Sequence, residues 1–545
     1  MTDASIEADR PRGSSLARST ALMTGGTVIS RLTGVVRLAV LAATLGVAET
    51  RLADTYNLAN TAPNILYELV LGGVITSVFV PMFVELLEKE KRDDAWRSIS
   101  AILNVCLVAL AVLAVVGMLA APLIARFYSS RLEGAEIEEQ RAAITLLLRL
   151  LIPQVVLYGI YFITSAILNA NRRFALPMYT PIINNLVLIA VLIFFRNEYG
   201  LVTLTSVTTT QLLVIGIGTT VSVAPMGLLL LPTLRRLGGY SFTLKIEPVL
   251  LKKLGKLSAY VIGFVAANQI GYVVVQWLAN GTKGGYTAYI AAFTFFLLPI
   301  GLFVWSLTTA IVPSMSSHAV GERWDDFRND VSLAVRAILF LMVPATVGFL
   351  ALGAPLVDLL LKHGVVTGGS TKLIVDVLSF FVLGLVQFSV FQVLVRAFYA
   401  TQDARTPFLI NCVVVALNTA INIPMYYWIG VKGLAAGQAI AYTVGIALQA
   451  KTLGRRSGGF DSKRIYATAA RVMPAAAGMG AVTWLAREGI ERTIGSDSLV
   501  QQVITLGVPT AVGVASYLAL ATLFKVEEMS FVKGLLLRRP NPAAA

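Results

Sequence analysis

Residues 168–181 read "LNANRRFALPMYTP", and residues 398–411, "FYATQDARTPFLIN", resemble them. The alignment pairs Ala170 with Ala400 and Pro177 with Pro407. A second pair, "VITSVFVP" at 74–81 and "SLTTAIVP" at 306–313, is separated by nearly the same length of sequence. Two matches at nearly one offset predict two homologous halves, although two helix–proline–helix junctions could also resemble each other by chance.

The segments around these junctions are strongly apolar. The chain has 545 residues, of which 56% are hydrophobic and 14% charged, and its mean hydropathy is +0.76. Soluble proteins carry about 25% charged residues, and a run of about 20 apolar residues can cross the bilayer as a helix. We therefore expect a polytopic membrane protein with about fourteen spans, at 24–46, 54–86, 99–127, 142–168, 177–195, 205–232, 252–279, 286–315, 330–360, 372–400, 406–428, 432–453, 465–486 and 499–524.

The charged loops predict the topology. Loops on the side of the two termini carry more than twice as many Lys and Arg residues as the opposite loops, which places both termini in the cytoplasm. The net charge of +14 is then explained by this topology and by anionic lipid headgroups, so nucleic acid is not an expected partner. Each half has an even number of spans, so the halves insert in the same orientation, as in transporters with parallel repeats.

The expected fold is all-α, with two six-helix lobes and two additional C-terminal helices. We expect cytoplasmic tails at 1–23 and 525–545, an N-lobe at 24–236, a C-lobe at 237–455 and the additional helices within 456–524. Because both lobes lie in one chain, a monomer is expected.

No enzyme signature is present in the sequence. Cys106 and Cys412 each lie inside an apolar run and are expected to be buried free thiols. The histidines, His318 and His363, are far apart in the sequence, so neither a metal cluster nor a catalytic triad is indicated. "GTKGG" at 281–285 lacks the spacing of a nucleotide-binding loop. We expect no enzyme, metal or cofactor, and any transport would be coupled to the membrane potential, a cation or the gradient of the substrate.

Two arginines stand inside the first expected span, in "SRLTGVVR" at 30–37. A charge at the bilayer centre costs about 2.5–3.5 kcal/mol on insertion scales, so such residues usually face a cavity or the bundle interior. Arg31 and Arg37 are about 9 Å apart along a helix and roughly 120° apart around it. They are predicted to border a broad cavity, although Arg31 could instead extend to the cytoplasmic interface.

The second expected span carries a polar stripe. Its five residues follow spacings of three and four, which places them on one helical face; they are Asp54, Asn57, Thr61, Asn64 and Glu68. In lipid such a stripe must face protein or water. A cavity wall is the leading interpretation, and polar contacts between packed helices are the alternative.

Other polar residues in the spans indicate less. Arg149, Arg336 and Asp376 lie near predicted span ends, where we expect their side chains to extend to the interface. Asn418 and Asn422 are four residues apart and form a weak candidate cation site.

At the level of motifs, the chain resembles the MurJ (MviN) family of lipid II flippases, within the MATE-like (MOP) exporter superfamily. The resemblance rests on "SRLTGVVR", on "ADTYNLANTAPNILYELVLGGVITSVFVP" at 53–81, and on the two junctions quoted above. It extends from the first to about the twelfth span, and its "PNILYELVLGG" form resembles the actinobacterial branch.

This resemblance implies a central cavity that opens alternately to each side, with 456–524 forming a groove for the undecaprenyl tail. The substrate would be lipid II, a pyrophosphate-linked disaccharide-pentapeptide, moved to the outer leaflet of the bacterial plasma membrane for peptidoglycan synthesis, with cell-wall machinery as a further partner. Guanidinium groups suit a pyrophosphate. The implied substrate-binding residues are Arg31, Arg37, Asp54, Asn57, Thr61, Asn64, Glu68 and Thr294.

Three positions depart from the family pattern. Leu38 stands where an acid is usual, and Tyr67 and Thr294 stand where cavity arginines are usual. Either the pyrophosphate is bound with fewer cations, or the chain carries a different lipid-linked substrate. A non-transporting partner of cell-wall synthesis, which the missing arginines favour, and a MATE-like exporter of small molecules are kept as alternatives. Cavity arginines argue against the exporter, because they would repel cationic drugs.

Overall fold

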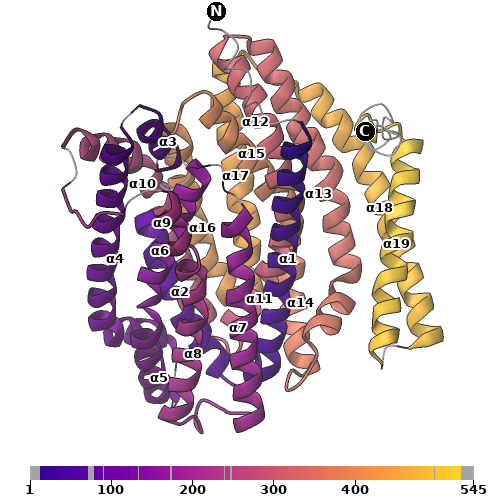
Figure 1. Cartoon of the computed structure of the whole chain (residues 1–545). Helices are drawn as coiled ribbons and strands as arrows, with labels where there is room; N and C mark the ends of the chain where they lie inside the picture. Colours follow the sequence, from indigo (N-terminus) through magenta and orange to yellow (C-terminus); the bar gives the residue numbers. More distant parts are fainter. Residues whose placement is uncertain are drawn as a thin grey trace, which may run out of the picture. The chain divides into compact units, whose positions relative to one another are not determined.

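The computed structural model describes residues 13–529 except 72–78, 90, 133, 135, 172, 174, 238–239, 246–247 and 496–497. Residues 1–12 and 530–545 of the expected tails, and part of the repeat at 74–81, lie outside the described residues. The described chain is helical and contains no strand (Figure 1). Its first ten helices are α1 (Gly13–Leu45), α2 (Leu52–Leu71), α3 (Val80–Lys89), α4 (Arg92–Tyr128), α5 (Glu136–Leu151), α6 (Gln154–Ala170), α7 (Ala175–Tyr199), α8 (Thr209–Leu228), α9 (Leu231–Leu237) and α10 (Pro248–Ala279).

The second half of the chain follows with nine more. These are α11 (Gly285–Pro299), α12 (Trp305–Val320), α13 (Trp324–Leu361), α14 (Gly368–Leu383), α15 (Leu385–Ala400), α16 (Arg405–Ile429), α17 (Lys432–Ser457), α18 (Ser462–Ile494) and α19 (Leu499–Leu523). A short 3-10 helix follows α4 (Ser129–Arg131), and a π-helical turn (Ile300–Val304) joins α11 to α12.

These helices form two compact units. Unit 1 holds the chain up to Gly46 and from Thr50 to Gln269, and unit 2 holds Val47–Glu49 and the chain from Ile270 onwards. The division falls inside α10, so this helix contributes to both units. The lobe boundaries expected from the sequence stay predictions, except that α1 begins at Gly13, inside the expected tail.

Matching helices of the two units support the internal repeat. α4 and α13 contain 37 and 38 residues, and α5 and α14 contain 16 residues each. α6 and α15 contain 17 and 16 residues, and α7 and α16 contain 25 residues each. The first residues of all four pairs are separated by nearly the same length of sequence, which is also the separation of the two junctions that resemble each other. Chance similarity of two short motifs would not repeat helix lengths over consecutive elements.

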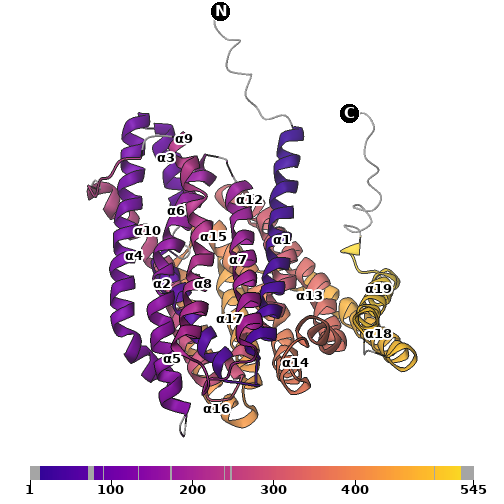
Figure 2. The same cartoon turned by 60° about the horizontal axis from the view of Figure 1, so that its bottom comes forward.

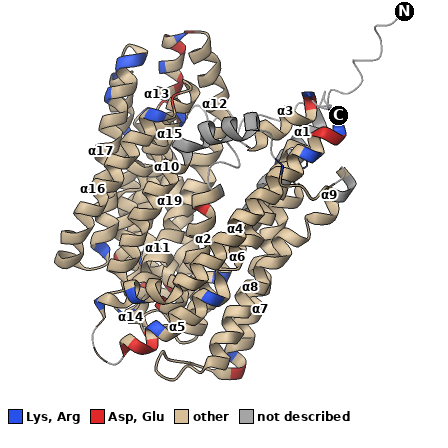
Figure 3. Ribbon diagram, turned by 90° about the vertical axis from the view of Figure 1, so that its left-hand side faces the viewer, with Lys and Arg blue, Asp and Glu red and all other residues tan. Residues whose placement is uncertain are grey.

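The helices have the length and composition of membrane spans. Within the described residues, 9 helices are long and apolar enough to cross a bilayer, or 10 if α14 and α15, bent by 47° at Gly384, form one span. α2, α17 and α18 are not among them, because small and polar residues lower their mean hydropathy. Each of the expected spans nevertheless coincides with one helix or a consecutive helix pair. In Figure 3 the charged residues gather at the helix ends, and the lengths between are mostly uncharged.

The C-terminal pair α18 and α19 packs beside α13 in unit 2 (Figures 1 and 2). Phe340 of α13, Met479 of α18 and Tyr517 of α19 belong to one apolar cluster, and the Tyr517 hydroxyl donates to the Phe340 carbonyl at 2.7 Å. Val526 and Met529, which follow α19, are buried in the same cluster. The chain after α19 therefore folds back onto α13 and α18.

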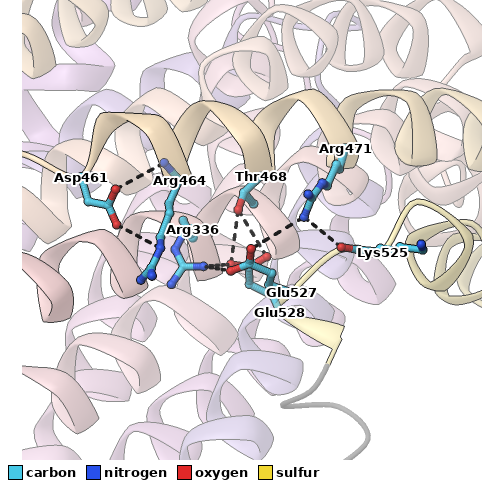
Figure 4. A network of polar contacts seen from close by, with 8 residues as sticks. All are labelled: Arg336, Asp461, Arg464, Thr468, Arg471, Lys525, Glu527 and Glu528. Carbon is cyan, nitrogen blue, oxygen red and sulfur yellow. Dashed lines mark hydrogen bonds and ion pairs between the residues drawn. The ribbon is translucent and has the colours of Figure 1, made fainter.

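A network of ion pairs joins α13, α18 and the segment after α19 (Figure 4). The Arg336 guanidinium lies 3.0 Å from Glu527 and 2.8 Å from Glu528, and the Glu528 side chain is only 2% exposed. Thr468 and Arg471 of α18 add contacts to Glu528 and Glu527. The expectation that Arg336 extends to the interface is therefore wrong, because its carboxylate partners come from a distant part of the chain and only the tertiary structure brings them to it.

Candidate functional site

Helix α1 carries Arg31 and Arg37 in unit 1. The Arg31 side chain is exposed, whereas Arg37 is half-buried. Arg37 lies within electrostatic range of two phenols, that of buried Tyr56 on α2 and that of half-buried Tyr158 on α6. Where a guanidinium is partly shielded from water, its attraction for an anion is stronger than in bulk solvent.

The polar stripe of α2 divides into two parts. Asp54 is 0% and Asn57 8% exposed, and both have polar partners within the structure. Thr61, Asn64 and Glu68 are half-buried. The Thr61 hydroxyl and the Asn64 amide donate to backbone carbonyls of α2 itself, at 2.8 Å and 3.3 Å. The N-terminal part of the stripe is thus buried, and its later turns keep polar groups partly accessible.

Glu68 stands beside an aromatic cluster. The Tyr67 hydroxyl donates to the Glu68 carboxylate at 3.0 Å. The Tyr67 ring stacks on Phe162 with centroids 4.7 Å apart and tilts against Tyr158 at 5.2 Å. Tyr67, which stands where the family often has an arginine, therefore supplies ring surface and a hydrogen bond instead of a positive charge.

The aromatic partners of Arg37 and Tyr67 were missing from the sequence prediction. Tyr158, Tyr161 and Phe162 all come from "YGIYF" on α6, where spacings of three and four place them on one helical face. That spacing was visible in the sequence. The sequence does not show that this face lies next to α2, because α6 packs on α2 only in the tertiary structure.

The remaining predicted residues lie in unit 2. The Thr294 hydroxyl donates to the Ile290 carbonyl of its own helix at 2.9 Å. Asn418 and Asn422 pair with each other, with amide nitrogen to oxygen distances of 3.0 and 3.4 Å, and Asn422 is 1% exposed. A cation at this pair would take amide oxygens that now accept from the neighbouring amide.

Comparison with known proteins agrees with the architecture and the motifs. The family model described as lipid II flippase MurJ matches residues 41–505. A protein of Rhizobium tropici described as a probable lipid II flippase MurJ is 26% identical over 542 residues, covering 97% of this chain and 98% of its own. One of Thermotoga maritima with the same description is 25% identical over 508 residues, covering 92% and 96%.

Solved structures show the same fold. A lipid II flippase MurJ in an inward closed conformation superposes with a TM-score of 0.75 at 22% identity, over 92% of this chain and 98% of that one. A MATE multidrug resistance transporter of the MOP superfamily, in an inward-facing conformation, gives a TM-score of 0.64 at 13% identity, over 81% and 95%. These two likenesses concern the fold, whereas the family model matches most of the sequence. The chain belongs to the lipid II flippase MurJ family.

Proposed function

We propose that the protein moves lipid II from the inner to the outer leaflet of the bacterial plasma membrane by alternating access. The family match over residues 41–505 supports this function. The observation that carries it in the structure is Arg37, a half-buried arginine of α1 within electrostatic range of the Tyr56 and Tyr158 phenols. The fold shared with MATE transporters does not favour drug export, because that likeness extends to the architecture alone.

The pyrophosphate of the substrate would be held by Arg31 and Arg37. A guanidinium offers two parallel N–H donors to phosphate oxygens, and its charge persists at every physiological pH. Exposed Arg31 would meet the headgroup first, and half-buried Arg37 would hold it in the drier part of unit 1. With Leu38, Tyr67 and Thr294 at positions where the family often has charge, these two arginines carry most of the anion binding.

The polar residues of α2 would have two roles, contact with the headgroup and support of the helix. Thr61, Asn64 and Glu68 are accessible enough to orient the sugar and peptide parts of the headgroup. Asp54 and Asn57 are buried and would hold α2 in place. The Tyr67 ring adds an apolar surface against which a sugar ring can pack.

The membrane potential suits this direction of transport. When the membrane potential is negative inside, moving one negative charge outward lowers its free energy by about 2.3 kcal/mol per 100 mV. A pyrophosphate headgroup would therefore be driven outward without nucleotide hydrolysis. A cation at Asn418 and Asn422 is a second coupling route, which would require their paired amides to separate.

The topology follows from the same proposal. Both termini would lie in the cytoplasm, the chain would act as a monomer in the inner membrane, and α18 and α19 would line a groove for the lipid tail. Cell-wall synthesis enzymes would receive the product.

Substitution of Arg37 tests the proposal. In cells that depend on this gene, Arg37→Ala should abolish lipid II translocation and cause lipid II to accumulate on the inner leaflet. Arg37→Lys should retain part of the activity, since it keeps the charge and loses the two-pronged geometry. Arg97→Ala, at an exposed position of α4, is the matched control and should flip normally. Normal translocation by a well-expressed Arg37→Ala protein would refute the pyrophosphate role.

A further inference from the structure

An open groove lies on the surface of unit 1 between α4 and α5, and none of its lining residues belongs to the candidate functional site. It has a volume of about 440 Å³, and its lining includes Pro122 and Arg126 of α4 and Glu138, Arg141, Thr145 and Arg149 of α5. The α5 members recur at spacings of three and four, which places them on one helical face. Three of the lining residues are arginines and one is an acid.

Two of these arginines carry uncompensated charge. Arg141 pairs with Glu138 at 2.6 Å and donates to the Ser129 hydroxyl at 2.9 Å. Arg126 and Arg149 are exposed, and their guanidinium groups have no polar partner among the described residues. The groove therefore presents two guanidinium groups that are free to bind an anion, held on neighbouring packed helices.

The surroundings of the groove are those of a lipid-facing surface. On α4, Val116, Leu119 and Leu123 are 54%, 75% and 70% exposed, and they lead along the helix to Arg126. Because α4 is long and apolar enough to span a bilayer, we interpret this exposed apolar side as facing lipid tails. The Arg126 end of the groove is thus at headgroup level, with acyl-chain surface directly beside it.

Arg149 lies deeper than Arg126. It follows Arg141 by two helical turns on α5, about 12 Å further along the helix axis. Helical side chains lean toward the N-terminus of their helix, so Arg149 extends back toward the groove and the interface. An exposed guanidinium at this depth is costly unless an anion accompanies it.

We propose that this groove binds the headgroup phosphate of an anionic phospholipid, in the leaflet that contains the α4–α5 connection. The phosphate contacts Arg126 and Arg149, and one acyl chain lies along Leu119 and Leu123. Free inorganic phosphate is a poorer occupant, because it makes no use of the adjacent apolar surface. With cytoplasmic termini this leaflet is the outer one. The proposal concerns binding at equilibrium and is independent of lipid II transport.

Lipid binding to the purified full-length protein tests the site. Phosphatidylglycerol and phosphatidylcholine adducts are titrated by native mass spectrometry for the protein and for an Arg126→Gln/Arg149→Gln variant. Loss of two charge-assisted contacts should weaken phosphatidylglycerol binding about tenfold or more and leave phosphatidylcholine binding unchanged. Glu138→Gln frees Arg141 from its partner and should strengthen phosphatidylglycerol binding severalfold.

Controls separate this site from general attraction of a basic protein for acidic lipid. Lys91→Gln/Arg97→Gln removes two exposed charges from the other end of α4 and should bind phosphatidylglycerol as the parent does. Thermal unfolding in detergent verifies that the variants are folded; if the double variant is not, Arg149→Gln and Glu138→Gln alone must shift affinity in opposite directions. Unchanged binding by the groove variants, equal binding of the two lipids, or displacement of the lipid by millimolar inorganic phosphate overturns the proposal.

Discussion

At the scale of one residue, Glu49 shows how a loop side chain can organise a distant helix. Its carboxylate accepts from the Thr367 amide and hydroxyl and from the Ser370 hydroxyl, each at 2.7 Å, and from the Val47 amide at 2.7 Å. Thr367 is the N-cap of α14, whose N-terminus favours negative charge. Burial alone raises the pKa of Glu49, but the hydrogen bonds from Val47, Ser370 and Thr367 outweigh it and lower the pKa to about 2.

This lowered pKa predicts a pH-dependent contribution to stability. The ionised carboxylate stabilises the fold above its ordinary pKa of 4.5, and the contribution is lost as the pH falls toward 2. Glu49→Gln should therefore lower the free energy of unfolding at pH 7 by about 1 kcal/mol, a value reduced for partial exposure. Thermal unfolding in detergent at pH 7 and at lower pH should show the gap between the two proteins closing below pH 4.5. A gap of equal size at pH 3 would contradict the assignment.

At the scale of elements, small residues set how closely α16 and α17 pack. Gly433 and Gly437 of α17 form a small-xxx-small pair. A Cβ at Gly437 would overlap the Asn422 side-chain oxygen, and one at Gly433 would overlap the Met425 carbonyl group. The absence of a side chain at these two positions therefore permits the close approach of the helices.

Gly437→Ala should accordingly separate the two helices and disturb the Asn418–Asn422 pair. We expect a loss of about 1–3 kcal/mol in unfolding free energy. Gly507→Ala on α19 is the matched control, since nothing lies within 4 Å of its new Cβ; it should be neutral or stabilising by up to about 1 kcal/mol through helix propensity. Equal effects of the two substitutions, measured by denaturation in detergent, would refute close packing as the cause.

At the scale of the molecule, the Arg336 network holds the segment after α19 against α13 and α18. Removing one member of a buried pair leaves the other charge uncompensated, which costs about 3–5 kcal/mol. Arg336→Ala should therefore destabilise the protein strongly and expose the segment after α19 to proteolysis, because Glu528 remains buried without its main partner.

Replacing both partners provides the complementary experiment. Arg336→Leu/Glu528→Leu removes both charges and should recover much of the lost stability. Arg464→Ala breaks only the partly exposed contact with Asp461 and should change the unfolding free energy by less than about 1 kcal/mol. If Arg336→Ala were as mild as Arg464→Ala in limited proteolysis and thermal unfolding, the network would not anchor this segment.

Much of the architecture was accessible from the sequence. Apolar runs long enough to cross a bilayer, separated by short charged loops, predicted the helices. The similar junctions at 168–181 and 398–411 predicted two related halves. The spacing of Asp54 to Glu68 placed those residues on one face of α2. Which part of that face is buried could not be predicted, since the burial of Asp54 and Asn57 arises only when the chain folds.

The sequence by itself determined the class of protein, the helices, the internal repeat and the two arginines of α1, because hydrophobic length and local spacing act along the chain. Only the tertiary structure decided which charges are compensated. Arg336 finds its carboxylates after α19, and Glu49 caps a helix in the second half of the chain. Arg126 and Arg149 face one groove, where the described residues give their guanidinium groups no partner. The physical reason is that a charged side chain is compensated only by groups within a few ångströms of it. For Arg336 and Glu49, packing supplies those groups from segments far apart in the sequence.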